Sequence, residues 1–324
     1  MSIDTSPGPA PAGTDRSTNA NKAVVQPGDR IFSGLAKGAG ILILVVLAGV
    51  AAFLVIEATP ALLAPADQIP GGNGLVAYIG PLVFGTLLAA VIALVIATPL
   101  AVAVALFITH YAPRRIAAGL GYVIDLLAAV PSIVYGLWGA STLAVASIPL
   151  LIWLETYLGW IPLFAGPASG TGRTMLIAGV VLAVMILPII TAVSREVFLQ
   201  TPKLHEEAAL ALGATRWEMI RMAVLPFGRS GIISGAMLGL GRALGETMAV
   251  ALVLSASGGI TFNLIGSGNP ATIAANIALQ FPEANRLDVN VLIASGLVLF
   301  LITLAVNSLA RLIINRRREF SGAN

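Results

Sequence analysis

Long apolar stretches alternate with short polar segments along this chain of 324 residues. A helix needs about 20 apolar residues to cross the hydrocarbon core of a bilayer, and six stretches of the chain meet that length. Four of them carry no charge, whereas the third carries Asp125 and the fifth carries Arg242 and Glu246. The pattern predicts an all-α polytopic membrane protein with about six transmembrane helices, over residues 38–56, 80–109, 116–147, 174–194, 230–255 and 289–310.

Basic residues gather in alternate segments between the predicted spans. They flank the first and last spans and occupy 110–115 and 195–229, whereas 57–80 holds none. Because an excess of Lys and Arg marks cytosolic loops, we expect both termini to be cytosolic. The run from Leu150 to Trp153 could begin a further membrane helix, but Glu155 interrupts it and glycines and prolines follow. We therefore interpret 148–172 as an outer loop.

Composition supports a membrane protein and excludes several chemistries. Hydrophobic residues make up 57% of the chain and charged residues 10%, against about 25% charged in average soluble domains. Because the chain has no cysteine, disulfides, thiolate metal sites and cysteine nucleophiles are excluded. The two histidines, His110 and His205, are far apart in predicted cytosolic loops, so we expect no enzyme activity and no metal site. The basic residues lie beside apolar segments, which indicates membrane orientation rather than nucleic-acid binding.

The ends of the chain differ from its middle. Residues 1–29 are rich in Ser, Thr, Pro, Gly, Ala and Asn, a composition typical of disordered segments. The first apolar run begins too far from the start for a cleaved signal peptide, so we interpret it as an uncleaved anchor. These features predict a disordered cytosolic tail over 1–29, a transmembrane domain over 30–318 and a short tail over 319–324.

The predicted cytosolic loop over 195–229 carries signals for two short helices. Thr201 followed by Pro202 favours a helix start, and Gly213 favours a stop. Thr215 and Glu218 match a capping box that begins a second helix. At helical spacing, the apolar face of that helix holds Trp217, Ile220, Val224 and Leu225. On physical grounds alone, this amphipathic unit is either a connector beneath the bundle or a docking site for a partner.

The same loop resembles the EAA motif that permeases of bacterial ATP-binding-cassette (ABC) importers carry between two late spans. The residues that carry the resemblance are Glu207, Ala208, Ala209, Gly213, Leu225 and Pro226. In that family the helix around the motif docks into a cleft of the cytosolic ATPase, so the resemblance implies ATPase coupling for these residues. The family usually has an isoleucine or a similar residue where this chain has Ala223. None of Lys22, Lys37 and Lys203 follows a phosphate-loop glycine pattern, so we expect a partner to bind and hydrolyse ATP and this chain to carry no cofactor.

Two further stretches resemble signatures of phosphate-specific importers. They are residues 126–139, LLAAVPSIVYGLWG, and residues 239–250, GLGRALGETMAV. Residues 28–32 and the Gly-Arg-Ala-Leu sequence are more similar to the PstC-like permease subunit than to its PstA-like partner. The resemblance implies a type I ABC importer permease in the bacterial plasma membrane, with phosphate as its substrate. It also implies a PstA-like second permease, a PstB-like ATPase dimer and a PstS-like external phosphate-binding protein as partners.

Other transport classes remain alternatives. A molybdate or sulfate permease would carry the same ATPase-docking motif. A secondary carrier predicts inverted repeats between the two halves of the chain, and none is visible in the sequence. The segment 256–288 is interpreted either as a contact for the external binding protein, with a short helix over 271–281, or as a solvated loop.

The charged residues of the fifth span are candidates for the substrate path. Arg242 and Glu246 lie four residues apart, which predicts that they share one face near the middle of the fifth span. The Leu, Ile and Val residues of this span favour insertion by roughly 3 to 5 kcal/mol, whereas the two charges oppose it by roughly 5 to 7 kcal/mol. Neighbouring helices or water must therefore shelter them. They form either a buried ion pair that locks the bundle or a gate in which Arg242 meets the anion and Glu246 weakens its binding.

The third span holds the remaining path candidates. Pro131, beside Ser132, together with Gly136 predicts a bend in the helix, because proline removes a backbone donor and crowds the preceding turn. Such a bend either lines the path or merely suits packing. Asp125 lies about 15 Å along the helix from Arg115, which is a shallow depth in the membrane. We interpret it as a solvated or capped structural carboxylate.

Overall fold

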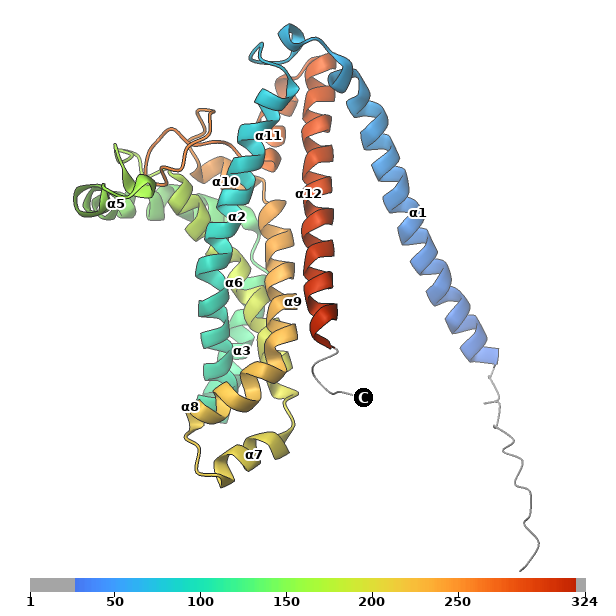
Figure 1. Ribbon diagram of the computed structural model, residues 1–324, viewed down its shortest axis with the longest axis vertical. Coiled ribbons are helices and arrows are strands. Elements are labelled where there is room, and N and C mark those ends of the chain that lie inside the picture. Colours follow the sequence, from blue (N-terminus) through green and yellow to red (C-terminus); the bar gives the residue numbers. More distant parts are fainter. Residues whose placement is uncertain (1–26, 319–324) are drawn as a thin grey trace, which may run out of the picture. The chain divides into compact units, whose positions relative to one another are not determined.

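The computed structural model describes residues 27–318, and these are helical over most of their length. Within this range, extended pairing is limited to a single bridge between Ala256 and Asn269. Six helices of the described part are long and apolar enough to cross a membrane (Figure 1). The prediction of an all-α protein with six such helices is confirmed. Of the predicted tails over 1–29 and 319–324, residues 1–26 and 319–324 lie outside the described residues, whereas residues 27–29 begin the first helix.

Most helices follow one another with short connections, and the two longest cover residues 159–174 and 254–272. The α-helices are α1 (Pro27–Leu63), α2 (Leu75–Leu106), α3 (Arg114–Ala128), α4 (Ser132–Trp138), α5 (Ala144–Leu158), α6 (Met175–Leu199), α7 (Lys203–Ala211), α8 (Arg216–Met219), α9 (Leu225–Leu244), α10 (Met248–Val253), α11 (Ile273–Gln280) and α12 (Arg286–Arg318). Turns of π-helix cover Phe107–Tyr111, Gly139–Leu143 and Ile220–Val224, and 3-10 turns cover Ala66–Gln68, Pro162–Phe164 and Phe281–Glu283.

The chain divides at Val50 into two units. The described part of the first unit is the beginning of α1, and its residues 28–50 are exposed along their whole length. Its apolar side chains suit contact with lipid. The second unit begins at Ala51 and holds every other described element.

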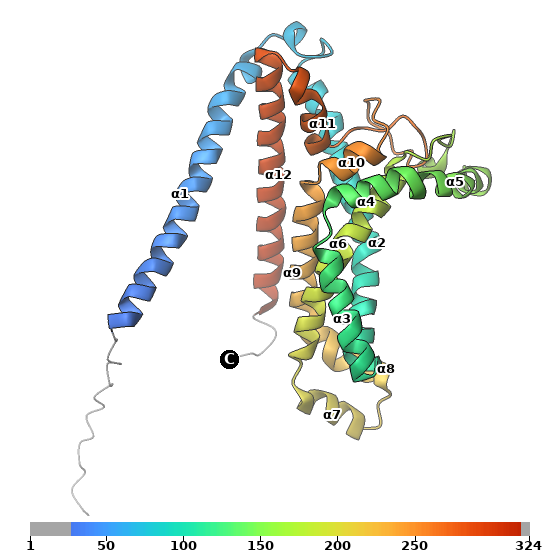
Figure 2. The same ribbon diagram turned by 180° about the vertical axis from the view of Figure 1, so that it is seen from behind.

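Small residues bring α2, α6 and α9 close together in the second unit (Figures 1 and 2). Every fourth residue along one side of α2 is a buried alanine, namely Ala89, Ala93, Ala97, Ala101 and Ala105. On α9, a Cβ added to Gly231 would lie 2.3 Å from Val197 of α6, and one added to Gly239 would lie 3.0 Å from Ile190. Membrane helices associate through such small residues because these let the backbones approach.

The predicted third span over 116–147 is not one helix. α3 ends at Ala128, and Pro131 is the residue that precedes α4. Proline disfavours helical backbone in the residue before it, so the helix stops and a new one begins rather than bending. Figure 2 shows α4 and α5 turning away from the direction of α3. The stretch expected to be an outer loop from residue 148 onwards is helical as far as Leu158.

Gly136 lets α4 pack closely against its neighbours and does not bend the helix. A Cβ on Gly136 would lie 2.7 Å from the Cα of Ala249 in α10, and one on Gly139 would lie 2.6 Å from Val181 in α6. α4 therefore packs directly against α10, and the π turn that follows it packs against α6. This contact places the start of α4 beside the region where α9 gives way to α10.

The segment between α10 and α12 is partly buried. It is therefore not the solvated loop that was one of its two interpretations. Asn269 is fully buried; its side chain accepts a hydrogen bond from the Met175 N–H and donates to the carbonyls of Ser255 and Gly266. The short helix predicted over 271–281 is present as α11. These hydrogen bonds anchor the segment to the start of α6.

Candidate functional site

The segment over 201–224, here called the α7–α8 segment, is shaped by local hydrogen bonds. Gly213 has a φ of +85°, in the left-handed region that favours glycine. Its N–H donates to the Leu210 carbonyl at 3.0 Å, and the Ala214 N–H donates to the Ala209 carbonyl at 3.2 Å. This pair of bonds is the Schellman motif that ends a helix. The predicted stop of α7 at Gly213 is confirmed.

The predicted capping box at the start of α8 is also present. The Glu218 N–H donates to the Thr215 hydroxyl at 3.3 Å, and the Glu218 carboxylate accepts from the Thr215 N–H at 2.8 Å. Each side chain satisfies a backbone donor that the first turn of a helix leaves free. Sequence signals within a few residues therefore determine the form of this segment.

The buried face beyond α8 differs in part from the prediction. Met219, Ile220 and Val224 are buried against Phe198 and Leu106, but Trp217 is 56% exposed. The prediction assumed regular helical rotation, which the π turn beginning at Ile220 interrupts. The segment is therefore anchored to the bundle by this cluster, with Trp217 left at the surface.

The EAA residues lie on both faces of α7 and at the start of α9. Glu207 and Ala208 are exposed, and Ala209 is half-buried against the cluster that holds Met219 and Ile220. Leu225 and Pro226 begin α9 and are half-buried and exposed, respectively. The outer face of α7 also carries Leu204 and Leu212, which are 78% and 90% exposed. Charged and apolar side chains thus share a surface that is open to a partner.

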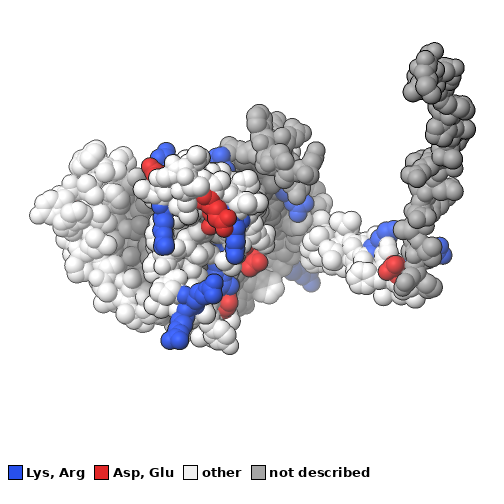
Figure 3. Space-filling model, turned by 90° about the horizontal axis from the view of Figure 1, so that it is seen from below, with Lys and Arg blue, Asp and Glu red and all other residues white. Residues whose placement is uncertain are grey.

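Basic side chains surround this surface. Figure 3 views the end of the bundle that carries α7, with Lys and Arg spread over it and acidic residues between them. We call it the basic end; its exposed basic residues include Arg114, Arg115, Lys203, Arg216, Arg221 and Arg229. Asp125 lies towards this end in α3 and pairs with Arg195 of α6 at 3.7 Å. Asp125 thus has a cation partner, in addition to its contact with solvent.

The fifth predicted span is interrupted between its two charged residues. α9 ends at Leu244, and Glu246 lies in the short break before α10. The Glu246 carboxylate, 8% exposed as a residue, accepts a hydrogen bond from the Ala249 N–H at 3.1 Å. It thereby supplies an acceptor for the first turn of α10. Within the described residues, no ion pair joins it to Arg242, so the locking ion pair, one of the two alternatives, is absent.

The path candidates lie in different elements. Arg242 is half-buried near the end of α9. Ser132 is half-buried at the start of α4, whereas Pro131 is exposed just before it. α4 packs against α10, the helix that follows α9 in the chain.

Sequence reasoning missed one pairing at the basic end. His110 at the end of α2 and Glu206 in α7 lie 3.6 Å apart, between Nε2 and Oε1. The sequence contains no signal for this contact, because its two residues are remote in the chain and each lies in a separate helix. Glu206 directly precedes the EAA residues.

The described part of the chain thus combines six helices of membrane-crossing length with an exposed helix–glycine–helix segment. The chain belongs to the family described as binding-protein-dependent transport system inner membrane components, whose model matches residues 97–319. It is therefore a multi-pass inner membrane protein of bacteria.

Relatives place the chain more closely within this family, and a solved structure shares its fold. It is 45% identical to phosphate transport system permease protein PstC 2 of Mycobacterium tuberculosis, over 88% of this chain and 91% of that protein. It is 39% identical to phosphate transport system permease protein PstC of Mesorhizobium japonicum, over 91% and 92%. A bacterial ABC transporter involved in the import of the acidic polysaccharide alginate has a similar fold, with a TM-score of 0.54, 17% identity and coverage of 89% of this chain and 99% of that one.

Proposed function

We propose that this chain is the PstC-like permease subunit of an ATP-driven importer of inorganic phosphate. The similarity to proteins named as PstC, at 39% to 45% identity over most of their length, supports phosphate as the substrate. The observation that carries the coupling role is the exposed outer face of α7, where Glu207 and Ala208 lie before the Gly213 stop. This surface provides a docking site for an ATPase.

We assign three protein partners to the chain. A second, PstA-like permease completes the translocation path, and a PstB-like ATPase dimer binds the α7–α8 segment. A PstS-like external protein delivers phosphate to the opposite end of the bundle. ATP binds to the ATPase subunits, and this chain needs no cofactor of its own.

The orientation of the chain follows from its charges. The basic end faces the cytosol, because Lys and Arg are retained on that side during insertion. Reporters fused after Arg115, near Gly213 and after Arg318 should then be cytosolic, and one near Gly71 should be external. An external reporter at Gly213 would contradict ATPase docking at α7.

The region around Arg242 is the proposed path. An anion crossing the membrane needs a fixed positive charge, and ionisable residues inside a membrane usually mark ion pathways. Arg242 meets phosphate there, and Glu246 prevents it from binding too tightly. Ser132 and Pro131 line the same region from the start of α4.

Reconstitution tests the proposed function. The chain is expressed with its genomic neighbours, purified as a complex and placed in liposomes with the binding protein and ATP. ATP-dependent uptake of phosphate, with little competition from sulfate or molybdate, is the expected result. Uptake of sulfate or molybdate instead would favour the other oxyanion class, and transport without ATP would favour a secondary carrier.

A further inference from the structure

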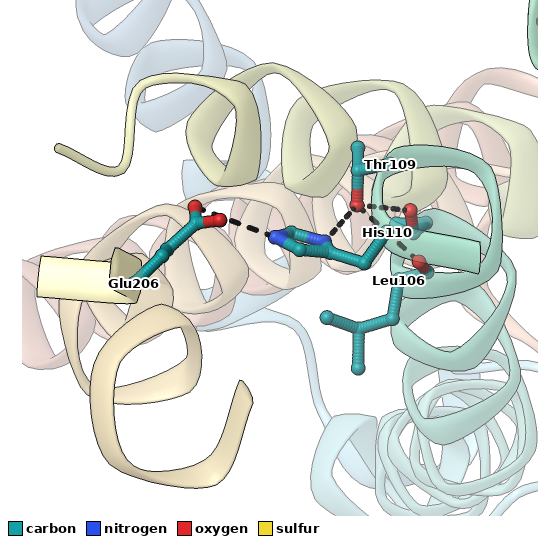
Figure 4. Close-up of polar contacts among 5 residues, drawn as sticks. Leu106, Thr109, His110 and Glu206 are labelled. Atoms are coloured by element: carbon teal, nitrogen blue, oxygen red, sulfur yellow. Dashed lines mark hydrogen bonds and ion pairs between the residues drawn. The ribbon is translucent and has the colours of Figure 1, made fainter. Parts of the chain in front are cut away.

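His110, at the end of α2, faces the inner side of α7. It belongs to the π turn Phe107–Tyr111, and its Nε2 lies 3.6 Å from Glu206 Oε1. On the other side of the ring, Nδ1 lies 2.6 Å from the Thr109 hydroxyl oxygen (Figure 4). The side chains of His110 and Glu206 are 9% and 24% exposed, respectively, so the contact is largely shielded from water.

The Thr109 hydroxyl holds the His110 ring against the backbone of the preceding turn. Its oxygen lies 2.6 Å from His110 Nδ1, 2.9 Å from the Ala105 carbonyl and 3.4 Å from the Leu106 carbonyl. These contacts fix one edge of the ring, and the opposite edge, with Nε2, faces the Glu206 carboxylate.

The π turn determines the direction in which His110 points. The Ala112 N–H donates to the carbonyl of Phe107, five residues back, at 2.8 Å. In a regular α-helix the bond spans four residues, so the extra residue turns the end of α2 by about 100°. Such bulges occur frequently at functional sites. Here the bulge belongs to the same turn that carries the contact with α7.

α7 has few other attachments to the bundle. No residue of α7 is buried, and Glu206 and Ala209 are its two half-buried residues. These two lie three residues apart, on one face of the helix. Ala209 supplies an apolar contact to the cluster that includes Ala105 and Phe198. Glu206 supplies the polar contact, which it makes with His110 at the end of α2.

Towards its N-terminal end, α2 contacts α11 and the residues that precede α11. The Thr86 hydroxyl, in a residue 2% exposed, accepts a hydrogen bond from the Ile273 N–H at 2.9 Å. A Cβ added to Gly85 would lie 2.3 Å from the Ala271 carbonyl oxygen, which shows how closely the two backbones approach. α2 therefore links the underside of α7 to the first turn of α11.

We propose that the His110–Glu206 contact transmits movement of α7 to α2, and through α2 to α11. The inference rests on the proposed function, because a docked ATPase supplies the movement of α7. His110 and Glu206 are positioning residues, which act through the helices they join. Loss of the contact uncouples ATP hydrolysis from transport while the ATPase stays bound through the outer face of α7.

The test is a double-mutant cycle on the reconstituted importer, measured as phosphate transported per ATP hydrolysed. His110→Ala and Glu206→Ala should each lower this ratio by roughly threefold or more, with ATP hydrolysis continuing. The double variant should be no worse than the worse single variant, because each change already removes the same contact. His110→Lys should keep most of the wild-type ratio of phosphate transported to ATP hydrolysed, since an ammonium group can also reach the carboxylate.

Glu196→Ala is the matched control for loss of a carboxylate. Glu196 is exposed on α6 towards the basic end, and its one side-chain contact, to Gln200, is 3.4 Å long. The Glu196→Ala variant should transport as much phosphate per ATP hydrolysed as the wild type. If alanine variants reduce the amount of complex in the membrane, Glu206→Gln provides the same measurement with a side chain of equal size.

Three results would overturn the inference. They are an unchanged ratio in both single variants, additive losses in the double variant, and loss of the ATPase during purification of the single variants. The last would show that the contact only attaches α7 to its partner. A wild-type complex that hydrolyses ATP but takes up no phosphate would instead contradict the proposed function.

Discussion

The two ends of α9 hold charged residues in different ways. Before its start, Glu207 and Glu218 are exposed, and the backbone around them is closed by the Gly213 turn and the capping box. Beyond its C-terminal end, Glu246 is buried, and its carboxylate accepts a hydrogen bond from the Ala249 N–H. Arg242, in the last turn of α9, is half-buried.

This difference separates surface recognition from chemistry inside the bundle. A charge at the surface is solvated, so changing it has little effect on the fold and acts mainly on a partner. A charge in a shielded place must be compensated within the protein or by a ligand. Substitutions at the two ends of α9 should therefore affect different measurements.

The largest effect is expected from Arg242→Gln. Hydrogen bonds to charged groups contribute about 1.5 to 3 kcal/mol each. Without the guanidinium of Arg242, the path loses its charged hydrogen bonds to phosphate. Phosphate uptake should be abolished, while membrane abundance and ATPase retention stay near those of the wild type. Arg229→Gln, an exposed change on the same helix, is the control and should transport normally.

The outcome of this substitution distinguishes a gate from a structural role. Uptake that survives Arg242→Gln would exclude the gate. If abundance collapses instead, the Arg242 charge is structural, and recovery on adding Glu246→Gln would show that the two charges compensate each other without a direct ion pair. The amide retains an acceptor for the Ala249 N–H, so the start of α10 is preserved.

Gly213→Pro should disrupt the surface end next most strongly. Proline fixes φ near −65° and has no N–H, whereas this position has a φ of +85° and donates to Leu210. The local cost is about 3 kcal/mol or more, so the ATPase should be lost on purification while the chain stays in the membrane. Gly258→Pro, at another exposed glycine with a φ of +78°, should retain the ATPase. If both variants retain the ATPase equally, the α7–α8 segment is only a connector between helices and not a docking site.

Glu207→Lys should have a smaller effect that is confined to docking. The side chain is exposed, so stability should stay within about 0.5 kcal/mol of the wild type. Reversal of a charge at the docking surface should reduce ATPase retention by about tenfold, measured by quantitative copurification. Glu196→Lys on α6 serves as the comparison. A similar loss in both variants would indicate general electrostatics at the basic end rather than docking at α7.

The smallest effect is expected from Thr215→Ala, which removes the capping box. Loss of such a cap costs about 1 kcal/mol, and thermal unfolding in detergent should shift down by about 2 to 4 °C. Uptake should remain. Thr156→Ala, in which an exposed hydroxyl bonded to the Ile152 carbonyl is lost, should shift the midpoint less, because that hydroxyl caps no helix.

Local signals determined much of this protein. Apolar runs long enough to cross a bilayer predicted six helices, because a membrane offers backbone groups no partner outside the helix. The Gly213 stop and the Thr215–Glu218 box were predictable because their hydrogen bonds join residues at most five positions apart. The EAA residues were identified by their resemblance to a known family, and their role in ATPase coupling stays a prediction.

Tertiary structure decided the features that depend on contacts between distant helices. The close approach of Gly136 to Ala249 fixes where α4 packs, and α9 stops before Glu246 although its sequence allows the helix to continue. The prediction that Arg242 and Glu246 share one helical face was wrong because it assumed an unbroken helix. The pairing of His110 with Glu206 is decided in the same way, since it arises only when α2 and α7 are packed together. A sequence pattern reports neighbours along one helix, whereas contacts between helices follow from how their surfaces fit.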